Sequence, residues 1–383
     1  MVIKIVGERK YIGGGFQDTG GDWDHNFIAY ADSGDWQSLG SGLNEAVYDI
    51  EVSGSYVYAA GNFTADYAGG ITLNHIARWD WSSNSWEAVA PGITHGYVND
   101  LVLLGNGIFA GGTIEDTSGV DGLHYLAFWN GTEWESLGQG VNNQVNRNSL
   151  YLEGSRLYAG GQFTSAGGDS NARYIAWWDI SELDPNWNEV GGGLNGEVFA
   201  MAVVGPDVFV GGAFTDAGGT GGPDYIARWD TLSETWNSLG SGLNGAVRAL
   251  KVVGPDLYVG GDFTDAVTST GSPGLPPIVD RAGDYIARWD MIDSTWKKVS
   301  GGTDGPVYAL DVVEKMLAVG GAFTIVNNIP STEHFALFNL DDSGWQTIYT
   351  GLNGTVYTLK ATSQYVYAGG AFTGTATASA SFN

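Results

Sequence analysis

The side chains best suited to bind a ligand recur in one short motif, Gly-Leu-Asn-Gly and its variants. Its polar residue stands at Asn44, Asn142, Asn195, Asn244, Asp304 and Asn353. The fourth residue after this position is aromatic or basic in several copies, namely Tyr48, Arg248, Tyr308 and Tyr357. Amides beside aromatic and guanidinium groups are typical of sites for a glycan or a peptide. An Asn before a Gly also suits a left-handed turn, so a purely structural role is the alternative.

Acidic residues form a second set of candidates. They lie in Gly-rich segments such as FTDAGG, at Asp18, Asp66, Asp116, Asp216 and Asp265. Oxygen ligands on a tight loop suit calcium, and Asp18, Asp216 and Asp265 are the calcium candidates. The spacing Asp-x-Asp-x-Asp is absent from the sequence, however, so side-chain capping of turns is the alternative. We expect no other cofactor.

Histidine and cysteine give little support to a transition-metal site. Four histidines occur at one repeated position, just before an apolar run, and the fifth precedes another such run: His25, His75, His124, His334 and His95. These side chains belong to different repeat units, so we do not expect them to share an ion, and we place His95 in a loop. Cysteine is absent, which excludes a thiol nucleophile, a disulfide and a thiolate metal site.

An internal repeat of about fifty residues positions all of these side chains. The segment VRALKVVGPDLYVGGDFT, residues 247–264, recurs along the chain with its Gly-Gly step beginning at Gly13, Ala60, Gly111, Gly160, Gly211, Gly260, Gly320 and Gly369. Each copy continues into runs that resemble YIARWD and TWNSLGSGLNG. The units span about 1–46, 47–97, 98–144, 145–197, 198–246, 247–306, 307–355 and, as a partial copy, 356–383.

Each unit contains four short runs rich in β-branched and aromatic residues and bounded by Gly, Asn, Asp or Pro, which predicts four strands. No helical period of useful length competes with this pattern. Four antiparallel strands repeated at this length are typical of propeller blades, so we expect an all-β, single-domain β-propeller over residues 1–383. Paired glycines permit close backbone approach at the end of the second strand, and the Trp of the fourth strand fills the space between diverging sheets.

The pattern resembles the kelch-type repeat. The double glycine is followed by an aromatic in the third strand, at Trp79, Trp129, Trp178, Trp229, Trp289 and Phe338, and by a Trp in the fourth, at Trp36, Trp86, Trp134, Trp187, Trp236, Trp296 and Trp345. The runs YIARWD, TWNSLGSGLNG and LYVGGDFT are similar to kelch-like repeats of bacterial secreted and cell-surface proteins and of the fungal cortical polarity marker family. This resemblance implies a β-propeller with an interaction role and no transferable catalytic residues. Galactose-oxidase-like relatives need a Cys-crosslinked tyrosine, and this chain has no Cys.

The number of blades follows from a count of the strands. First and second strands occur eight times, third and fourth strands together seven times, and Ala380, Phe382 and Asn383 fit the end of an eighth third strand. We therefore favour eight blades, the last without its outermost strand, with seven blades as the alternative. The missing strand is either absent from this chain or donated by another one, since an open strand edge is a template for self-association.

Composition restricts the partners. The formal net charge of −27 makes nucleic acid and anionic membranes improbable, since both bind basic surfaces. The first residues contain no apolar run long enough for a signal peptide or a spanning helix, so we expect no membrane insertion, and an exported form would have lost its targeting segment. The acidic, Lys-poor, Cys-free composition favours an extracellular or cell-surface location. The long segment 264–284 breaks the repeat and is a further candidate for specificity.

From these observations we expect a non-enzymatic binding or assembly module that presents its loops to a glycan, a protein partner or copies of itself. The alternative is a carbohydrate-active enzyme with its site at the mouth of the propeller channel. That alternative requires two close carboxyl groups with raised pKa values, and no acidic pair stands out from the repeats in the sequence.

Overall fold

The computed structural model describes residues 1–17, 26–32, 35–117, 123–182, 186–219, 221, 225–264, 285–346, 351–363 and 365–375. The regular secondary structure in these ranges consists of β-strands. The described residues contain no helix that is long and apolar enough to cross a membrane. The chain divides into two compact units, Met1–Gly193 (unit 1) and Leu194–Asn383 (unit 2), so the expectation of a single domain stays a prediction.

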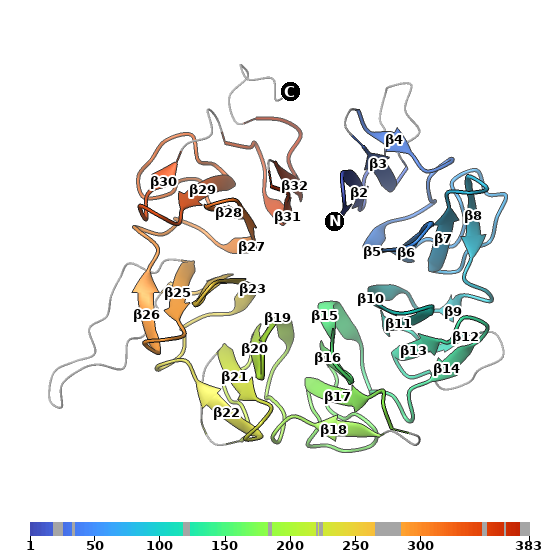
Figure 1. The fold of residues 1–383 in the computed structure, drawn as a ribbon, viewed down its shortest axis with the longest axis horizontal. Helices are drawn as coiled ribbons and strands as arrows, with labels where there is room; N and C mark the ends of the chain where they lie inside the picture. The colour runs from blue at the N-terminus through green and yellow to red at the C-terminus, as the bar shows by residue number, and fades with distance from the viewer. Residues whose placement is uncertain are drawn as a thin grey trace, which may run out of the picture. The chain divides into compact units, whose positions relative to one another are not determined.

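Unit 1 contains four antiparallel sheets of four strands, each in chain order (Figure 1). The sheets are β1 (Val2–Val6), β2 (Arg9–Gly13), β3 (Ile28–Ala31) and β4 (Gln37–Ser38); β5 (Val47–Ser53), β6 (Tyr56–Gly61), β7 (Ile76–Asp80) and β8 (Ser85–Ala88); β10 (Val98–Leu104), β11 (Gly107–Gly112), β13 (Leu126–Trp129) and β14 (Trp134–Ser136); and β15 (Val145–Glu153), β16 (Arg156–Gly161), β17 (Ile175–Asp179) and β18 (Trp187–Glu189). A separate pair joins β9 (Ile93–His95) to β12 (Asp116–Thr117).

Unit 2 contains three sheets of the same kind and one pair of strands. The sheets are β19 (Val198–Val204), β20 (Asp207–Gly212), β21 (Ile226–Asp230) and β22 (Thr235–Ser238); β23 (Val247–Val253), β24 (Asp256–Gly261), β25 (Ile286–Asp290) and β26 (Thr295–Lys298); and β27 (Val307–Val313), β28 (Met316–Gly321), β29 (Phe335–Asn339) and β30 (Trp345–Gln346). The pair is β31 (Val356–Ala361) with β32 (Val366–Gly370).

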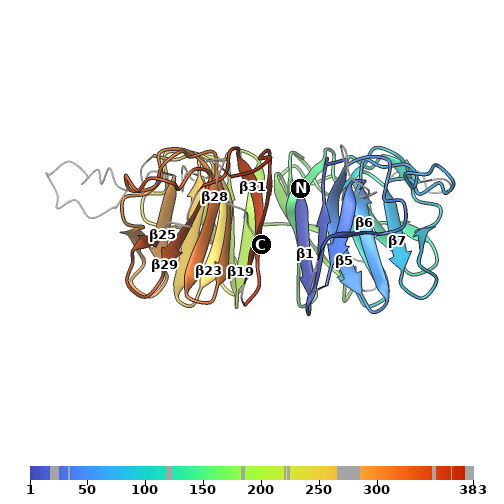
Figure 2. The same cartoon turned by 90° about the horizontal axis from the view of Figure 1, so that it is seen from above.

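This arrangement is the expected β-propeller of small antiparallel sheets. Within each unit the first strands of successive sheets contact one another, whereas the fourth strands are spread apart (Figure 1). The strands run across the thickness of each unit (Figure 2). The four-stranded sheets correspond to seven blades, the number that the sequence left as the alternative. The strands β31 and β32 begin the eighth repeat, and the third strand expected at Ala380, Phe382 and Asn383 lies outside the described residues.

Each glycine of the Gly-Gly step is required for a different steric reason. A Cβ on Gly260 would come within 2.5 Å of the side chain of Val307, which belongs to the first strand of the next sheet. A Cβ on Gly261 would collide with the carbonyl oxygen of Ala246, just before the first strand of its own sheet. The first strand bulges at this level, between Val247 and Ala249. The first glycine therefore permits packing between sheets, and the second permits the bulge within one sheet.

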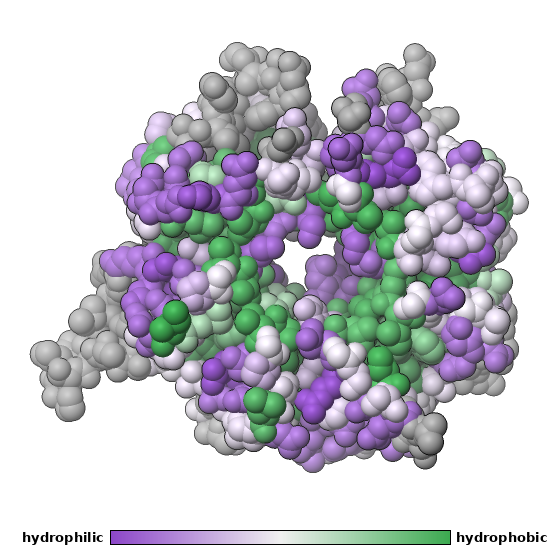
Figure 3. Space-filling view, in the orientation of Figure 1, coloured by the Kyte–Doolittle hydropathy of each residue, from purple (hydrophilic) through white to green (hydrophobic). Residues whose placement is uncertain are grey.

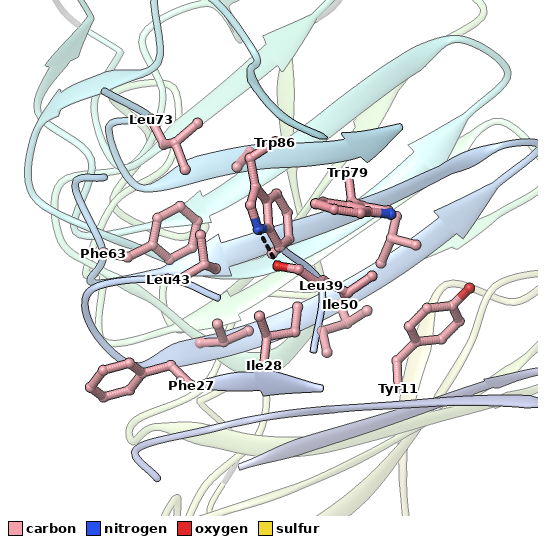
Figure 4. Packing of buried hydrophobic residues seen from close by; sticks show 14 residues of the cluster. Tyr11, Phe27, Ile28, Leu39, Leu43, Ile50, Phe63, Leu73, Trp79 and Trp86 are labelled. Atoms are coloured by element: carbon pink, nitrogen blue, oxygen red, sulfur yellow. Dashed lines mark hydrogen bonds between the residues drawn. The ribbon is translucent and has the colours of Figure 1, made fainter. Parts of the chain in front are cut away.

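The Trp of the fourth strand joins its sheet to the preceding one within each unit. The indole of Trp86 is buried, packs on Trp79 of the third strand with ring centroids 5.5 Å apart, and lies among apolar side chains of the first two sheets (Figure 4). Its Nε1 donates a hydrogen bond of 2.8 Å to the carbonyl oxygen of Leu39 in the preceding repeat. The same bond joins Trp187 to Leu137 and Trp296 to Leu239. The predicted space-filling role is confirmed, and the indole also pairs a buried backbone acceptor.

Candidate functional site

The Asn residues of the Gly-Leu-Asn-Gly motif join two loops of the same sheet. At the fourth sheet, β15–β18, Oδ1 of Asn142 accepts hydrogen bonds from the backbone N–H groups of Thr164 (2.8 Å) and Ser165 (3.0 Å). Its Nδ2 donates to Oγ1 of Thr164 at 2.9 Å. Equivalent contacts join Asn44 to Thr64, Asn195 to Thr215, Asn244 to Thr264, Asp304 to Thr324 and Asn353 to Thr373. The motif therefore fixes the loop from which the first strand starts.

At the third sheet, β10–β14, the corresponding loops pair as two short strands. Thr94 stands where the other repeats have Asn or Asp, and the short strands β9 and β12 pair there with Asp116 opposite His95. The sequence-based placement of His95 in a loop was therefore wrong. The backbone groups of the two loops bond to each other here, as in the bond of 3.2 Å from the N–H of Glu115 to the oxygen of His95, and the pairing extends far enough to form two short strands.

In unit 2 the second residues of the four first strands form a continuous row. The guanidinium carbon of Arg248 lies 5.0 Å from the ring centroid of Phe199 and 5.9 Å from that of Tyr308. Tyr308 stacks on Tyr357 with centroids 6.1 Å apart and an angle of 24° between the rings, and Tyr357 is 54% exposed. The structure thus brings together Arg248, Tyr308 and Tyr357 from the predicted set. Phe199, which the prediction omitted, occupies the same repeat position.

The charge in this row is neutralised locally. Both Nε and Nη2 of Arg248 contact Oδ2 of Asp262, at 2.9 and 2.6 Å. The hydrogen bond to Asp262 raises the pKa of Arg248, and burial followed by the negative charge of Asp262 raises the pKa of Tyr308. We define the first-strand row as Phe199, Arg248, Tyr308 and Tyr357 together with Asp262. It presents aromatic faces and one ion pair, without a net charge.

Unit 1 uses the same level of its first strands differently. Tyr48 and Tyr97 meet edge to face, with centroids 5.6 Å apart and an angle of 82°. The guanidinium carbon of Arg147 lies 3.5 Å from the ring centroid of Tyr48. On the face drawn in Figure 3, hydrophobic surface of unit 1 gathers toward its first strands and hydrophilic surface toward its outer strands. Tyr48, a predicted ligand contact, therefore lies in a cluster with two residues that the sequence reasoning missed.

Arg147 reaches Tyr48 because β15 contains two extra residues. In β5 the register runs from Val47 opposite Gly61 to Ile50 opposite Ala59. In β15 it runs from Val145 opposite Gly161 to Leu150 opposite Ala159, so the strand advances two residues further over the same distance of its partner. The insertion is visible in the sequence as a longer interval between Val145 and the following Gly-Gly step. The spacing of successive Gly-Gly steps does not reveal it.

A pair of carboxyl groups lies next to this cluster. Oδ2 of Asp100, which is only 6% exposed, accepts hydrogen bonds from the N–H groups of Ser149 (2.6 Å) and Leu150 (2.7 Å). Oδ2 of Asp49 accepts one from the N–H of Leu101 at 2.8 Å. Burial, and secondly the charge of Glu51, raise the pKa of Asp49 to about 6. Burial, and secondly the charge of Asp49, raise the pKa of Asp100 well above its ordinary value.

Two of the acidic loop residues, Asp66 and Asp216, accept local hydrogen bonds. Asp66 is 7% exposed, and its Oδ1 accepts a bond of 2.6 Å from the N–H of Ile71. Oδ1 of Asp216 accepts one of 3.0 Å from Gly221. Asp18 and Asp265 lie outside the described residues. Among residues that are described, no three or more His, Asp and Glu side chains are grouped so that they could hold a metal ion, and calcium binding stays a prediction.

The repeated histidine position is a backbone position of unusual geometry. His75, His124 and His334 precede their third strands with φ values of 68°, 43° and 63°, and His25 is not described. Nδ1 of His334 lies 3.2 Å from the carbonyl oxygen of Gly321, and burial lowers the pKa of His75. His75 and His124 precede the third strands of separate sheets in unit 1, and His334 precedes a third strand of unit 2.

Comparison with known proteins supports the fold alone. No family model matches the chain, and no curated protein matches it. The chain is similar to the crystal structure of the computationally designed Ika8 protein, with 13% identity, a TM-score of 0.60, and coverage of 96% of this chain and 92% of that one. Two further structures have TM-scores of 0.49: a chain of the mitotic checkpoint complex (15% identity, 82% and 81% coverage) and U3-55K (14% identity, 85% and 88% coverage).

Proposed function

We propose that this protein is a non-enzymatic binding module that recognises a neutral saccharide on the first-strand row of unit 2. The observation that carries the proposal is the continuous contact from Phe199 through Arg248 and Tyr308 to the exposed ring of Tyr357. These side chains come from four successive first strands, whose positions are fixed by the sheets behind them. A ligand site on rigid elements needs little reorganisation on binding.

The chemistry of the row favours a sugar over a charged ligand. Exposed tyrosine faces offer a broad apolar surface with polar hydroxyl groups at the edge, which suits the alternating C–H and O–H groups of a pyranose. The ion pair of Arg248 and Asp262 supplies fixed hydrogen-bond donors and acceptors without a net charge. The net charge of −27 disfavours polyanions over the whole protein.

The wider setting of this function is also a proposal. We place the protein outside the cell or at the cell surface, on the basis of its acidic, Cys-free composition and of its resemblance to kelch-like repeats of bacterial secreted proteins and the fungal polarity marker family. In that setting the propeller is a rigid support, and binding serves attachment or assembly. Self-association remains part of the proposal, because the eighth repeat is expected to lack its outermost strand, and an open strand edge is a template for a further strand.

One observation favours a carbohydrate-active enzyme as the second candidate. Asp49 and Asp100 are neighbouring carboxyl groups with raised pKa values, the property that a general acid needs. Both, however, accept hydrogen bonds from the backbone of the adjacent first strand, as expected of side chains that join two sheets. The test is hydrolysis of a saccharide by the protein. If Asp49→Asn and Asp100→Asn each abolish hydrolysis, the protein is an enzyme that uses this pair. If hydrolysis is unaffected by these changes, the pair is not catalytic.

The binding proposal is tested by titrating the protein with cellotetraose, mannotetraose and galactotetraose in a calorimeter. We expect at least one to bind, and we expect Tyr357→Ala to weaken it about tenfold, because one aromatic contact contributes on the order of 1 kcal/mol. Tyr365→Ala is the matched control, since Tyr365 is 58% exposed but lies outside the row. Absence of binding to all three sugars, or equal loss in both variants, contradicts the proposal.

A further inference from the structure

We propose that unit 1 carries a second subsite, formed by Arg147, Tyr48 and Tyr97, that binds a single carboxylate on a saccharide, such as a terminal uronic acid. The inference rests on the proposed saccharide function and extends it to a different unit and a different chemical group. It starts from the two extra residues in β15, because they depart from the repeat at the innermost strand of the sheet.

The inserted segment is held by its neighbours on both sides. Nδ2 of Asn99 donates a hydrogen bond of 2.8 Å to the carbonyl oxygen of Val145, just before the insertion. Oδ2 of Asp100 accepts bonds from the backbone of Ser149 and Leu150, just after it. Oγ of Ser149 donates a bond of 3.2 Å to the carbonyl oxygen of Arg147 itself. Asn99 and Asp100 act as positioning residues, because they fix the backbone that carries Arg147.

Asn148 shows that this backbone has an unfavourable local conformation. Its φ of 54° lies in the left-handed region, which costs a non-glycine residue free energy that the surrounding contacts must offset. The insertion is thus a defined structure with an energetic cost rather than a loose loop. Conformations of this kind concentrate at functional positions, which supports a role for the side chain that this one presents.

The guanidinium of Arg147 differs from that of Arg248, the other arginine in the described first strands. Arg248 is paired with Asp262, whereas none of the ion pairs in the described part of the chain includes Arg147. Its position over the Tyr48 ring removes water from one of its faces, and burial is the largest cause that lowers its pKa. A partly desolvated cation without a carboxylate partner is unusual in a chain with a net charge of −27.

The geometry selects a planar anion. A guanidinium that lies over an aromatic ring still directs its N–H groups outward in its own plane, where they match the two oxygens of one carboxylate. The rings of Tyr48 and Tyr97 meet at 82° and so form an apolar corner beside the cation, suited to the ring of a sugar. The overall negative charge repels a polyanion, so the site fits one isolated carboxylate on an otherwise neutral saccharide.

The test compares two oligosaccharides that differ only at one end, cellotriose bearing a terminal glucuronate and cellotetraose. Calorimetric titration of the wild type should show tighter binding of the glucuronate form by about tenfold, the effect of one charge-assisted contact. Arg147→Gln should remove this preference. Arg156→Gln is the matched control, because Arg156 is also in the fourth sheet and lies 4.3 Å from the ring centroid of Trp177. Arg147→Lys, which keeps the charge without the planar fork, should keep only part of the preference.

Several outcomes would overturn the inference. Equal affinity of the wild type for the two oligosaccharides would do so, as would a preference that persists in Arg147→Gln. Binding of a succinylated tetrapeptide with the same dependence on Arg147, but no preference among the sugars, would assign the subsite to peptides instead. The proposed function of unit 2 fails separately, since it depends on Tyr357 and on neutral sugars. Circular dichroism and thermal unfolding of each variant confirm that the fold is retained.

Discussion

The first strands of the two units share one pattern but differ in how they treat charge. In both units a lysine of one first strand contacts a carboxylate of the next, Lys4 with Glu51 in unit 1 and Lys251 with Asp311 in unit 2. In unit 2 the guanidinium of Arg248 is also paired, with Asp262. In unit 1 the carboxyl groups of Asp49 and Asp100 are buried next to each other. The guanidinium of Arg147 lies over the ring of Tyr48 and has no carboxylate partner among the described residues. The first strand β23 of unit 2 keeps the regular spacing of the repeat, whereas β15 of unit 1 contains two extra residues.

This difference indicates where the repeat tolerates change. The insertion in β15 leaves the pairing of β16, β17 and β18 in the same register type as in the regular sheets. The second, third and fourth strands and their tryptophans therefore supply the stable frame, and the first strands are free to vary in chemistry. Predictions about the frame should hold equally in both units, and predictions about charge should separate them.

The largest expected effect concerns the frame. A Cβ on Gly161 in unit 1 or on Gly212 in unit 2 would collide with the carbonyl oxygen of Gln144 or Glu197. Gly161→Ala and Gly212→Ala should therefore each lower the free energy of unfolding by about 3 kcal/mol, measured by urea denaturation. Gly70→Ala is the control, because a Cβ there meets nothing within 4 Å. A large loss in only one of the two units would show that the frame is not shared.

The next effect separates the units. Asp100→Ala leaves the N–H groups of Ser149 and Leu150 without their acceptor, and we expect a loss of about 2 kcal/mol in the free energy of unfolding at pH 5. Asp341→Ala is the control, since its carboxylate is 59% exposed and pairs with Lys315 at the surface. A loss no larger than in the control would mean that the buried carboxyl does not join the sheets.

The buried carboxyl groups of unit 1 should make the free energy of unfolding depend on pH. An Asp in an unfolded chain has a pKa of about 3.9, whereas burial raises the pKa of Asp49 to about 6. Between these values the folded chain keeps a proton that the unfolded chain has lost, so a rise in pH through this window lowers the free energy of unfolding. We expect a fall of about 1–3 kcal/mol between about pH 4 and pH 6.

Asp49→Asn removes one of the titrating groups and should flatten this slope, whereas Asp341→Asn should leave it unchanged. The measurement is a series of urea unfolding curves across the pH window. An identical slope in the wild type and in Asp49→Asn would contradict the assignment of the buried carboxyl pair.

The smallest expected change in stability comes from making unit 2 resemble unit 1. Asp262→Asn leaves Arg248 without its carboxylate, and loss of a surface ion pair should change the free energy of unfolding by less than about 1 kcal/mol. The same variant should bind the glucuronate-bearing oligosaccharide several-fold more tightly than the wild type does, as seen by calorimetry. Unchanged binding would show that an unpaired guanidinium on a first strand is not enough to attract a carboxylate.

The sequence predicted the frame well because the frame is what repeats. Close packing imposes the same steric requirements in each repeat. They are met by the Gly-Gly step, the third-strand aromatic and the fourth-strand Trp, as Gly260 and Trp86 illustrate. Arg248, Tyr308 and Tyr357 were found for the same reason, since they share one position of the repeat.

Other features were missed because the repeat is uninformative about exceptions. Asp49 and Asp100 face each other from different sheets, and nothing in their local sequence indicates that they share a buried space. The hydrogen bond from Asn142 to Thr164 was hidden because each residue has its own explanation in turn chemistry. Its signal was the joint recurrence of Asn before the first strand and Thr after the second. The recurring lengths between fixed residues, compared strand by strand, would have revealed Arg147.

The central claim is that ligands bind to the first strands while the remaining strands form the frame. Hydrogen–deuterium exchange with saturating cellotetraose, or whichever neutral tetrasaccharide binds in the calorimeter, tests it most directly. The account predicts slower exchange in peptides that cover the starts of β23, β27 and β31, where Arg248, Tyr308 and Tyr357 lie. Protection confined to the third and fourth strands, or no protection at saturation, would contradict it.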